Sequence, residues 1–228
     1  MPDIRGERRA ALDGADVMAA PALILRALVD ATKPRRPAAA GASASPWTRP
    51  CLAGRLVEVS GAAATASLTF AALLVLDAQR RGERAAWVTP RESTFFPPDA
   101  AASGVDLAAL PVVRVPRPGD VARAGERLVR SGAFDVVVLD LAVDGGVPLP
   151  LLTRLLGLAE KHDTAVVFLT QRPATAPSLG SVVSLRAEAR RTRLTDGAFA
   201  CELVALRDRR RPAGWTHCVT RRGPDGVR

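Results

Sequence analysis

Gly61 opens a run of small residues that ends at Ser67, and this run is the stretch of the sequence best suited to bind a phosphate group. It follows an apolar, partly β-branched segment at 55–60, which predicts a short buried strand. From Leu68 onward the apolar residues recur at helical spacing. A strand, a loop of small residues and a helix in this order form the skeleton of a nucleotide phosphate-binding loop. The pattern therefore predicts where a triphosphate would lie if the chain bound one.

The groups that would hold a triphosphate are replaced in this run. A working loop uses glycines to expose backbone N–H groups, a Lys to reach the phosphates and a Ser or Thr to bind Mg²⁺. Gly61 stands at the first glycine position, whereas Ala66, Ser67 and Leu68 stand where the second glycine, the Lys and the metal-binding hydroxyl belong. Ala66 is expected to be strained if it must turn with positive φ, and the Leu68 side chain cannot coordinate Mg²⁺. Taken alone, the run also fits an ordinary turn between a strand and a helix.

The composition indicates a globular, reduced protein. The 228 residues are 48% hydrophobic, which suffices for a domain with a buried core. Three Cys are too few and too scattered for a disulfide framework, and no apolar run reaches the length of a membrane span. Because the N-terminus also lacks the apolar region of a signal peptide, we expect a cytoplasmic protein that does not bind membranes.

The two His residues give no support to a metal site or to a hydrolase. His217 and Cys218 are adjacent, and Cys201 does not complete a zinc-binding spacing with them. Neither His accompanies a nucleophile elbow. We therefore expect no metal site and no catalytic residue of this kind.

The net charge of +9 is concentrated toward the C-terminal end. Residues 186–228 hold eleven basic and five acidic side chains, whereas residues 51–185 hold thirteen of each. Nearly all of the basic residues are Arg, which suits phosphate and carboxylate partners. A codon bias toward Arg and Ala would produce the same composition, so the charge alone does not identify a partner.

The order of the predicted elements indicates an α/β domain. Strands and helices alternate through the middle of the chain, which predicts a parallel sheet covered on both faces. After Gln171 apolar and polar residues alternate, which predicts antiparallel strands along one edge. The predicted strands are 55–60, 85–89, 112–115, 135–141, 164–169, 181–193, 199–207 and 215–220, and the predicted helices are 65–81, 106–110, 121–131 and 149–162.

Four regions are predicted along the chain. Residues 1–32 are expected to form a helical segment, and residues 33–50 a linker rich in Pro, Ala and Ser. Residues 51–220 form the core domain, and residues 221–228 a basic tail. Trp47, inside the linker, is expected to anchor it against the core.

From about residue 50 to about residue 220 the order of the pieces resembles the core of the RecA recombinase. The resemblance is carried by GRLVEVSG, RRGERAAWV, SGVDLAALPVVRVPRPGD, LVRSGAFDVVVLD and VVFLTQ, followed by the three-stranded edge. It implies a RecA-like core with a mostly parallel sheet, flanking helices and an antiparallel edge. It also implies that the altered loop stands where the family binds ATP.

The resemblance assigns roles to residues outside the loop. Arg91 falls at the position of the family's catalytic Glu, and Glu92, one residue further on, is the alternative. Asp140 matches the Walker B Asp, although a strand-end anchor would look the same, and Gln171 matches the Gln that senses the γ-phosphate. Without the Lys and the Mg²⁺ ligand, we expect no ATP hydrolysis, at best feeble ATP binding and no cofactor.

The family's two DNA-contacting loops would correspond to residues 143–150 and 172–180. Each of these loops holds at most one basic residue, and the first contains Asp144. Binding to a phosphodiester backbone needs several cations in register. The loops therefore argue against RecA-like filament binding to single-stranded DNA, and we expect DNA binding to be weak.

One basic run matches a contact surface of the family. In RecA a Lys-x-Lys on an edge strand reaches into the ATP site of the neighbouring protomer. The matching positions are Arg207 and Arg209, followed by Arg210 and Arg211. The resemblance thus implies a surface that docks on a RecA subunit and caps or interrupts its filament. A solvated basic edge strand is the alternative interpretation.

Among RecA relatives without an ATP site, the chain looks more like ImuA-type proteins than like SulA-type division inhibitors. The ImuA resemblance implies a non-catalytic accessory protein of damage-induced translesion synthesis. Its partners would be RecA, an ImuB-type polymerase homologue and, indirectly, an error-prone replicative-type polymerase. A SulA-like inhibitor that binds the division GTPase FtsZ and a weak, unorthodox ATPase are the alternatives.

Overall fold

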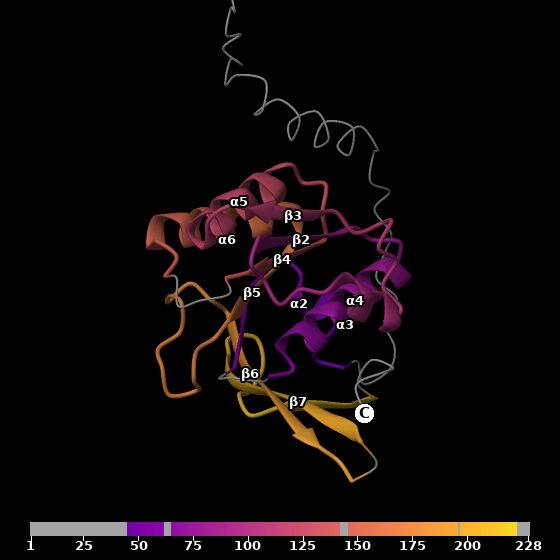
Figure 1. The fold of residues 1–228 in the computed structure, drawn as a ribbon. Coiled ribbons are helices and arrows are strands. Elements are labelled where there is room, and N and C mark those ends of the chain that lie inside the picture. The colour runs from indigo at the N-terminus through magenta and orange to yellow at the C-terminus, as the bar shows by residue number, and fades with distance from the viewer. Residues whose placement is uncertain (1–44, 62–64, 142–145, 196, 223–228) are drawn as a thin grey trace, which may run out of the picture. The chain divides into compact units, whose positions relative to one another are not determined.

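The computed structural model describes residues 45–61, 65–141, 146–195 and 197–222. In this part the chain builds one eight-stranded sheet with the order β3-β2-β4-β5-β1-β6-β7-β8 (Figure 1). The predicted helical segment 1–32, most of the predicted linker and residues 223–228 of the predicted tail lie outside the described residues.

Strands β1 to β6 pair in parallel, and β7 and β8 extend the sheet through antiparallel pairing. Strands β1, β2, β4 and β5 are buried along their whole length, as expected for apolar runs in the middle of a parallel sheet. Strand β6 pairs parallel with β1 and antiparallel with β7, which in turn pairs antiparallel with β8. The predicted α/β class with an antiparallel edge is therefore confirmed. The strands are β1 (Leu56–Ser60), β2 (Ala85–Pro90), β3 (Val112–Val115), β4 (Val136–Asp140), β5 (Ala165–Thr170), β6 (Leu185–Arg193), β7 (Ala198–Asp208) and β8 (Thr216–Arg222).

The direction of the crossovers places the helices on two faces of the sheet. The connections β1–β2 and β2–β3 run one way across the strand order, and β3–β4 and β4–β5 run the other way. Because parallel crossovers are right-handed, the first pair of connections and the second pair lie on opposite faces. Figure 1 shows α3 and α4 on one side of the sheet and α5 and α6 on the other. The helices are α2 (Arg49–Leu52), α3 (Ser67–Arg80), α4 (Pro97–Ala102), α5 (Val121–Arg130) and α6 (Leu149–His162), with a 3₁₀ turn η2 (Pro118–Asp120).

One predicted helix lies elsewhere than expected. The turn of helix predicted at 106–110 is wrong, because the Asp106 side chain accepts the N–H of Ala108 and folds this segment into a turn. The helix of this connection is α4, which begins with two prolines and carries Asp99 in its first turn. Proline at a helix start has the required φ and lacks only an N–H that would be unpaired there.

The core begins before the predicted boundary at residue 51. The Trp47 side chain is buried and its Nε1–H donates to the carbonyl of Phe70 at 2.9 Å, which confirms the predicted anchor. Arg49, in α2, pairs with Asp135 at 3.1 Å. At the other end, Arg221 and Arg222, predicted to start the tail, are the last residues of β8. None of the helices in the described ranges is long and apolar enough to cross a membrane.

Candidate functional site

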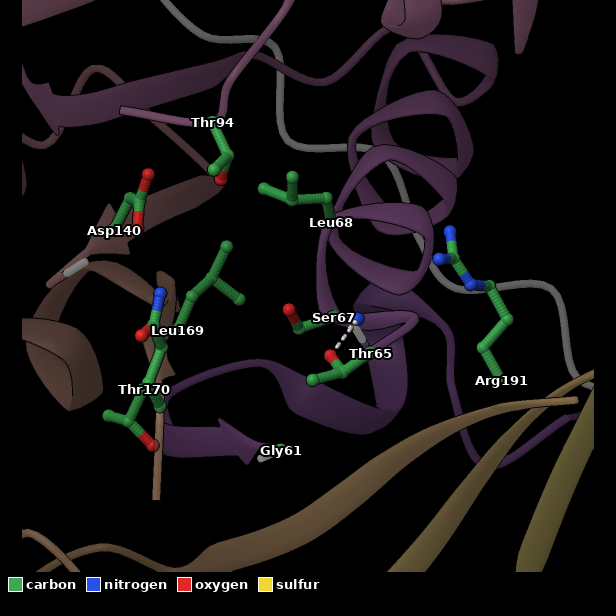
Figure 2. A pocket seen from close by; sticks show the side chains of 10 residues that line it. Gly61, Thr65, Ser67, Leu68, Thr94, Asp140, Leu169, Thr170 and Arg191 are labelled. Atoms are coloured by element: carbon green, nitrogen blue, oxygen red, sulfur yellow. Dashed lines mark hydrogen bonds between the residues drawn. The ribbon is translucent and has the colours of Figure 1, made fainter. Parts of the chain in front are cut away.

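A pocket of about 290 Å³ lies where the phosphate loop was predicted, beside the first turn of α3 (Figure 2). The strand register explains its position at the carboxyl edge of the sheet. Ser60 lies beside Thr170 and Asp140 lies beside Leu169, so the residues that follow β1, β4 and β5 meet there. Ligands of open α/β sheets bind at this edge. The lining residues are Gly61, Thr65, Ser67, Leu68, Thr94, Asp140, Leu169, Thr170, Gln171 and Arg191.

Most of the residues predicted for a degenerate nucleotide site meet in this pocket. Gly61, Ser67, Leu68, Asp140 and Gln171 all line it, although they come from three separate strand ends and one helix. The structure therefore brings together residues that the resemblance assigns to a nucleotide site.

The first turn of α3 satisfies one of its own backbone donors. The Thr65 hydroxyl accepts the N–H of Ser67 at 2.9 Å, shown by the dashed line in Figure 2. Gly61 makes room for this arrangement, since a Cβ at Gly61 would lie 2.5 Å from Cγ2 of Thr65. The N–H groups at a helix start are the ones that bind phosphate in a working loop. A phosphate here would have to displace the Thr65 hydroxyl first.

Ala66 and Leu68 show how this loop differs from the predicted phosphate-binding loop. The backbone of Ala66 has φ −93° and ψ 16°, so the expected strain is absent and the chain makes no positive-φ turn there. The Ala66 side chain is fully buried and does not line the pocket. The Leu68 side chain projects from α3 toward Thr94 and Asp140 (Figure 2). An apolar side chain thus stands at the position that the resemblance equates with the family's metal-binding hydroxyl.

Asp140 is held by a neighbour that the sequence did not reveal. Its Oδ2 accepts the hydroxyl of Thr89 at 2.9 Å, and both side chains are buried. Thr89 reaches it because β2 and β4 are adjacent, with Val88 paired to Leu139. The carboxylate therefore has a fixed position at the end of β4. Such a group can orient a hydrogen-bond donor or contribute to a cation site.

Arg91 does not join the pocket. It is exposed, its N–H donates to the carbonyl of Val115, and its own carbonyl accepts Arg114. The alternative Glu92 is also exposed and is not among the lining residues. Thr94 takes their place at the pocket wall. The connection after β2 thus presents a hydroxyl where the resemblance predicted a position equivalent to the catalytic Glu.

The ionisable lining groups are one carboxylate and one guanidinium. Arg191 comes from β6 and lies at the far end of the pocket from Asp140, with α3 between them in Figure 2. Its guanidinium lies 4.8 Å from the ring centre of Phe199, a cation–π contact. The other polar lining groups are hydroxyls and one amide, which form hydrogen bonds but do not neutralise several phosphate charges. Across the described ranges no three His, Cys, Asp or Glu residues gather into a metal-binding group.

A buried ion pair fixes the segment that the resemblance equates with a DNA-contacting loop. Glu58, in the middle of β1, lies with its Oε1 3.9 Å from Nε of Arg186, and both side chains are buried. Glu58 Oε2 accepts the Ser178 hydroxyl at 2.6 Å and the Leu179 N–H at 3.0 Å. Arg186 donates to the carbonyl of Pro173 at 2.9 Å. The part of this loop between 173 and 179 is thus tied to the sheet at several points. Residues 142–145 of the other loop lie outside the described residues.

The predicted basic run lies at the end of β7 and is tied to nearby carbonyls. Arg207 and Arg209 both donate to the carbonyl of Ser181, at 3.1 and 2.5 Å. Arg210 donates to the carbonyl of Ala53 at 3.0 Å. Each guanidinium carries five N–H donors, so a single backbone contact leaves others for a partner.

Arg211 completes this run beside α2. Its Nη2 lies 3.1 Å from the sulfur of Cys51. We refer to Arg207, Arg209, Arg210 and Arg211 as the arginine cluster.

The arginine cluster and the pocket lie at opposite edges of the sheet. Asp208 pairs with Leu185, which pairs with Val57 near the start of β1, whereas Gly61 follows its end. Four residues along a strand correspond to a separation of about 13 Å.

Residues 48–150 match the family model described as the RecA N-terminal domain. Protein RecA of Clostridium acetobutylicum is 41% identical over 88 residues, which cover 38% of this chain and 25% of that protein. Protein RecA of Roseiflexus sp. is 35% identical over 138 residues, or 52% of this chain and 38% of that protein. Protein RecA of Fusobacterium nucleatum is 30% identical over 138 residues, 52% of this chain and 36% of that protein.

These alignments cover between 25% and 38% of the length of the three relatives. The matched stretch runs from Thr48 to Pro150, so it contains the elements from α2 to β4 and the pocket residues up to Asp140. The chain is thus a RecA-like protein whose similarity lies in the N-terminal domain of that family.

Proposed function

We propose that this protein is a non-catalytic, ImuA-type accessory protein of damage-induced translesion DNA synthesis. In this proposal it binds RecA and an ImuB-type polymerase homologue, and through them serves an error-prone replicative-type polymerase. The partners are inferred from the resemblance, and the loss of catalysis from the pocket. The observation that carries the proposal is the first turn of α3. There the Thr65 hydroxyl accepts a hydrogen bond from the Ser67 N–H, and Leu68 stands in the place that the resemblance gives to a Mg²⁺ ligand.

The two edges of the sheet favour a one-sided contact with RecA. The amino edge carries the arginine cluster, whose exposed members Arg209 and Arg210 retain unused donors. The carboxyl edge carries a pocket whose charged groups are Asp140 and Arg191, and it lacks the residues of a phosphate-binding loop. A chain with these edges would dock on the nucleotide face of a RecA subunit, yet offer the next subunit little to bind. It would therefore cap or interrupt a filament.

Purified RecA filaments on single-stranded DNA with Mg-ATP test this proposal. We expect the protein to bind RecA only when ATP and DNA are present, to shorten the filaments in electron micrographs and to lower the steady-state ATPase rate. Absence of RecA binding, both with and without ATP and single-stranded DNA, would refute the RecA part of the proposal.

A paired substitution tests the surface separately. Arg207→Ala with Arg209→Ala should raise the concentration needed for half-maximal shortening by at least about tenfold, since two charged contacts are lost. Arg80→Ala with Arg114→Ala removes the same charge from exposed positions elsewhere and should behave like the parent. Because Arg207 and Arg209 also hold the Ser181 carbonyl, unchanged circular dichroism and Tm must accompany the result. Equal activity of both double variants would exclude the arginine cluster as the contact.

A weak nucleotide-binding activity is the second candidate. It is favoured by the retained pocket, in which Thr89 fixes Asp140 and Gln171 lies at the wall. Calorimetric titration with Mg-ATP separates this candidate from the accessory role without any partner protein.

A further inference from the structure

A second pocket, of about 340 Å³, lies between α5 and the start of α6, on the face of the sheet opposite α3. Three arginines line it: Arg123 and Arg127 from α5, and Arg154 from α6. Arg123 and Arg127 are four residues apart, so they lie on the same side of α5. The volume falls within the range of sites that hold a few side chains of a ligand. We refer to this pocket as the arginine groove.

The arginine groove carries excess positive charge. Glu126 is its one acidic lining residue, and it is shared by Arg130, which donates to it, and by Arg154 at 3.6 Å. Burial acts to raise the pKa of Glu126, but the hydrogen bond from Arg130 and the charges of Arg130 and Arg154 outweigh it, so the pKa is lowered. Glu126 therefore stays ionised, and its carboxylate is already paired with Arg130 and Arg154. In the described part of the chain, Arg123 and Arg127 have no carboxylate partner.

The other wall of the arginine groove is apolar and rigid. Pro148, Pro150 and Leu151 line it, and the neighbouring Leu149 is 54% exposed. Proline loses almost no side-chain entropy when a ligand covers it. Behind the groove α5 packs closely on β4, since a Cβ at Gly125 would lie 2.3 Å from a methyl carbon of the buried Leu139. The groove is thus preformed, which lowers the cost of binding.

We propose that the arginine groove binds an acidic segment of a partner protein, in which aspartate or glutamate residues flank a leucine-like side chain. The guanidinium groups would pair with the carboxylates, for which their planar fork is suited. The apolar side chain would cover Pro148, Pro150 and Leu151. A nucleic acid backbone would use the arginines but would leave this apolar wall without a function, so the observations favour a peptide. The inference does not rest on contact with RecA, since the groove lies on a helical face and the arginine cluster at a strand end.

Fluorescence anisotropy with a labelled peptide tests the inference on the full chain. The probe is the octapeptide Gly-Ser-Leu-Asp-Glu-Leu-Glu-Gly, compared with one peptide in which Lys replaces the acidic residues and another in which Ser replaces the leucines. We expect saturable binding of the first peptide, which weakens as salt is raised, and at least about tenfold weaker binding of the other two.

Matched variants locate the site. Arg123→Glu with Arg127→Glu should weaken binding of the acidic peptide by at least about tenfold, because both exposed charges are reversed. Arg80→Glu with Arg114→Glu makes the same charge change away from the groove and should leave the affinity within about twofold. No binding of the acidic peptide, or equal binding by both double variants, would overturn the inference. Tighter binding of an oligothymidine than of the peptide, lost with Arg123→Glu and Arg127→Glu, would also overturn it in favour of a nucleic acid site.

Discussion

Arg55 and Asp208 form a buried ion pair, with 2.5 Å between Nη2 of Arg55 and Oδ1 of Asp208. The pair joins the residue before β1 to the last residue of β7. Asp208 also accepts the backbone N–H of Arg210 at 2.9 Å and the Nε1–H of Trp215 at 3.0 Å. The residue between Arg207 and Arg209 therefore serves the fold, and it fixes the strand end from which the arginine cluster projects.

Asp208→Ala should destabilise the protein strongly. It would leave the Arg55 guanidinium buried without its carboxylate, and removing one partner of a buried pair typically costs about 3–5 kcal/mol. Chemical denaturation measures this change in the free energy of unfolding. Asp120→Ala is the matched control, because Asp120 pairs with the exposed Arg117 and its loss should cost no more than about 1 kcal/mol. Equal losses for the two variants would contradict the structural role of Asp208.

Glu58→Ala should release the loop after β5. The substitution removes the acceptor for Leu179 N–H and for Ser178, and it leaves Arg186 buried beside β1 without a carboxylate. We expect a loss of about 3–5 kcal/mol in unfolding free energy and faster amide exchange across residues 172–184. Hydrogen exchange with mass spectrometry measures the second effect. Glu188→Ala, which removes a partner of the exposed Arg190, should leave amide exchange in that loop unchanged. Exchange in Glu58→Ala that is as slow as in the parent would contradict the role of Glu58 in holding the loop.

Protonation of His217 should destabilise the folded protein. Burial lowers the pKa of His217, which lies 3.2 Å from the Ser45 hydroxyl and against the ring of Phe70. The unfolded chain, with the ordinary pKa of about 6.5, then binds more protons than the folded one between the two values. Stability is therefore full above about pH 6.5 and falls as the pH drops below it.

Thermal unfolding between about pH 5 and pH 7.5 checks this sign. The Tm of the parent should fall with decreasing pH more steeply than that of His217→Gln, which has no titrating group at this position. The difference between the two proteins isolates His217 from His162. A Tm difference that stays constant over the whole range would contradict the predicted linkage.

The sheet and half of the pocket follow from sequence patterns with direct physical causes. The apolar runs at β1, β4 and β5 predict buried strands, and parallel strands end at one edge. Asp140 and Gln171 each follow such a run, so their meeting with Gly61 is a consequence of topology. The antiparallel edge was predictable for the same reason, from alternation of apolar and polar residues.

Other features depend on contacts that no local pattern encodes. Arg191 reaches the pocket only because β6 pairs with β1, a register that the sequence does not state. Thr89 looks like any strand-end residue until β2 lies beside β4. The segment LVEVS does not indicate that the loop carrying Ser178 covers the Glu58 side chain. A Thr shortly before a helix, as at Thr65, was a usable signal, since Ser and Thr often satisfy the N–H groups of a helix start.

Calorimetric titration with Mg-ATP tests most directly whether this RecA-like fold is unable to bind a triphosphate. The triple substitution Ala66→Gly, Ser67→Lys and Leu68→Thr, which supplies the missing groups, serves as the comparison. We expect the parent to show no saturable heat up to about 1 mM ATP, which corresponds to a binding free energy weaker than about −4 kcal/mol. Saturable binding by the parent at micromolar ATP, accompanied by phosphate release, would contradict this account.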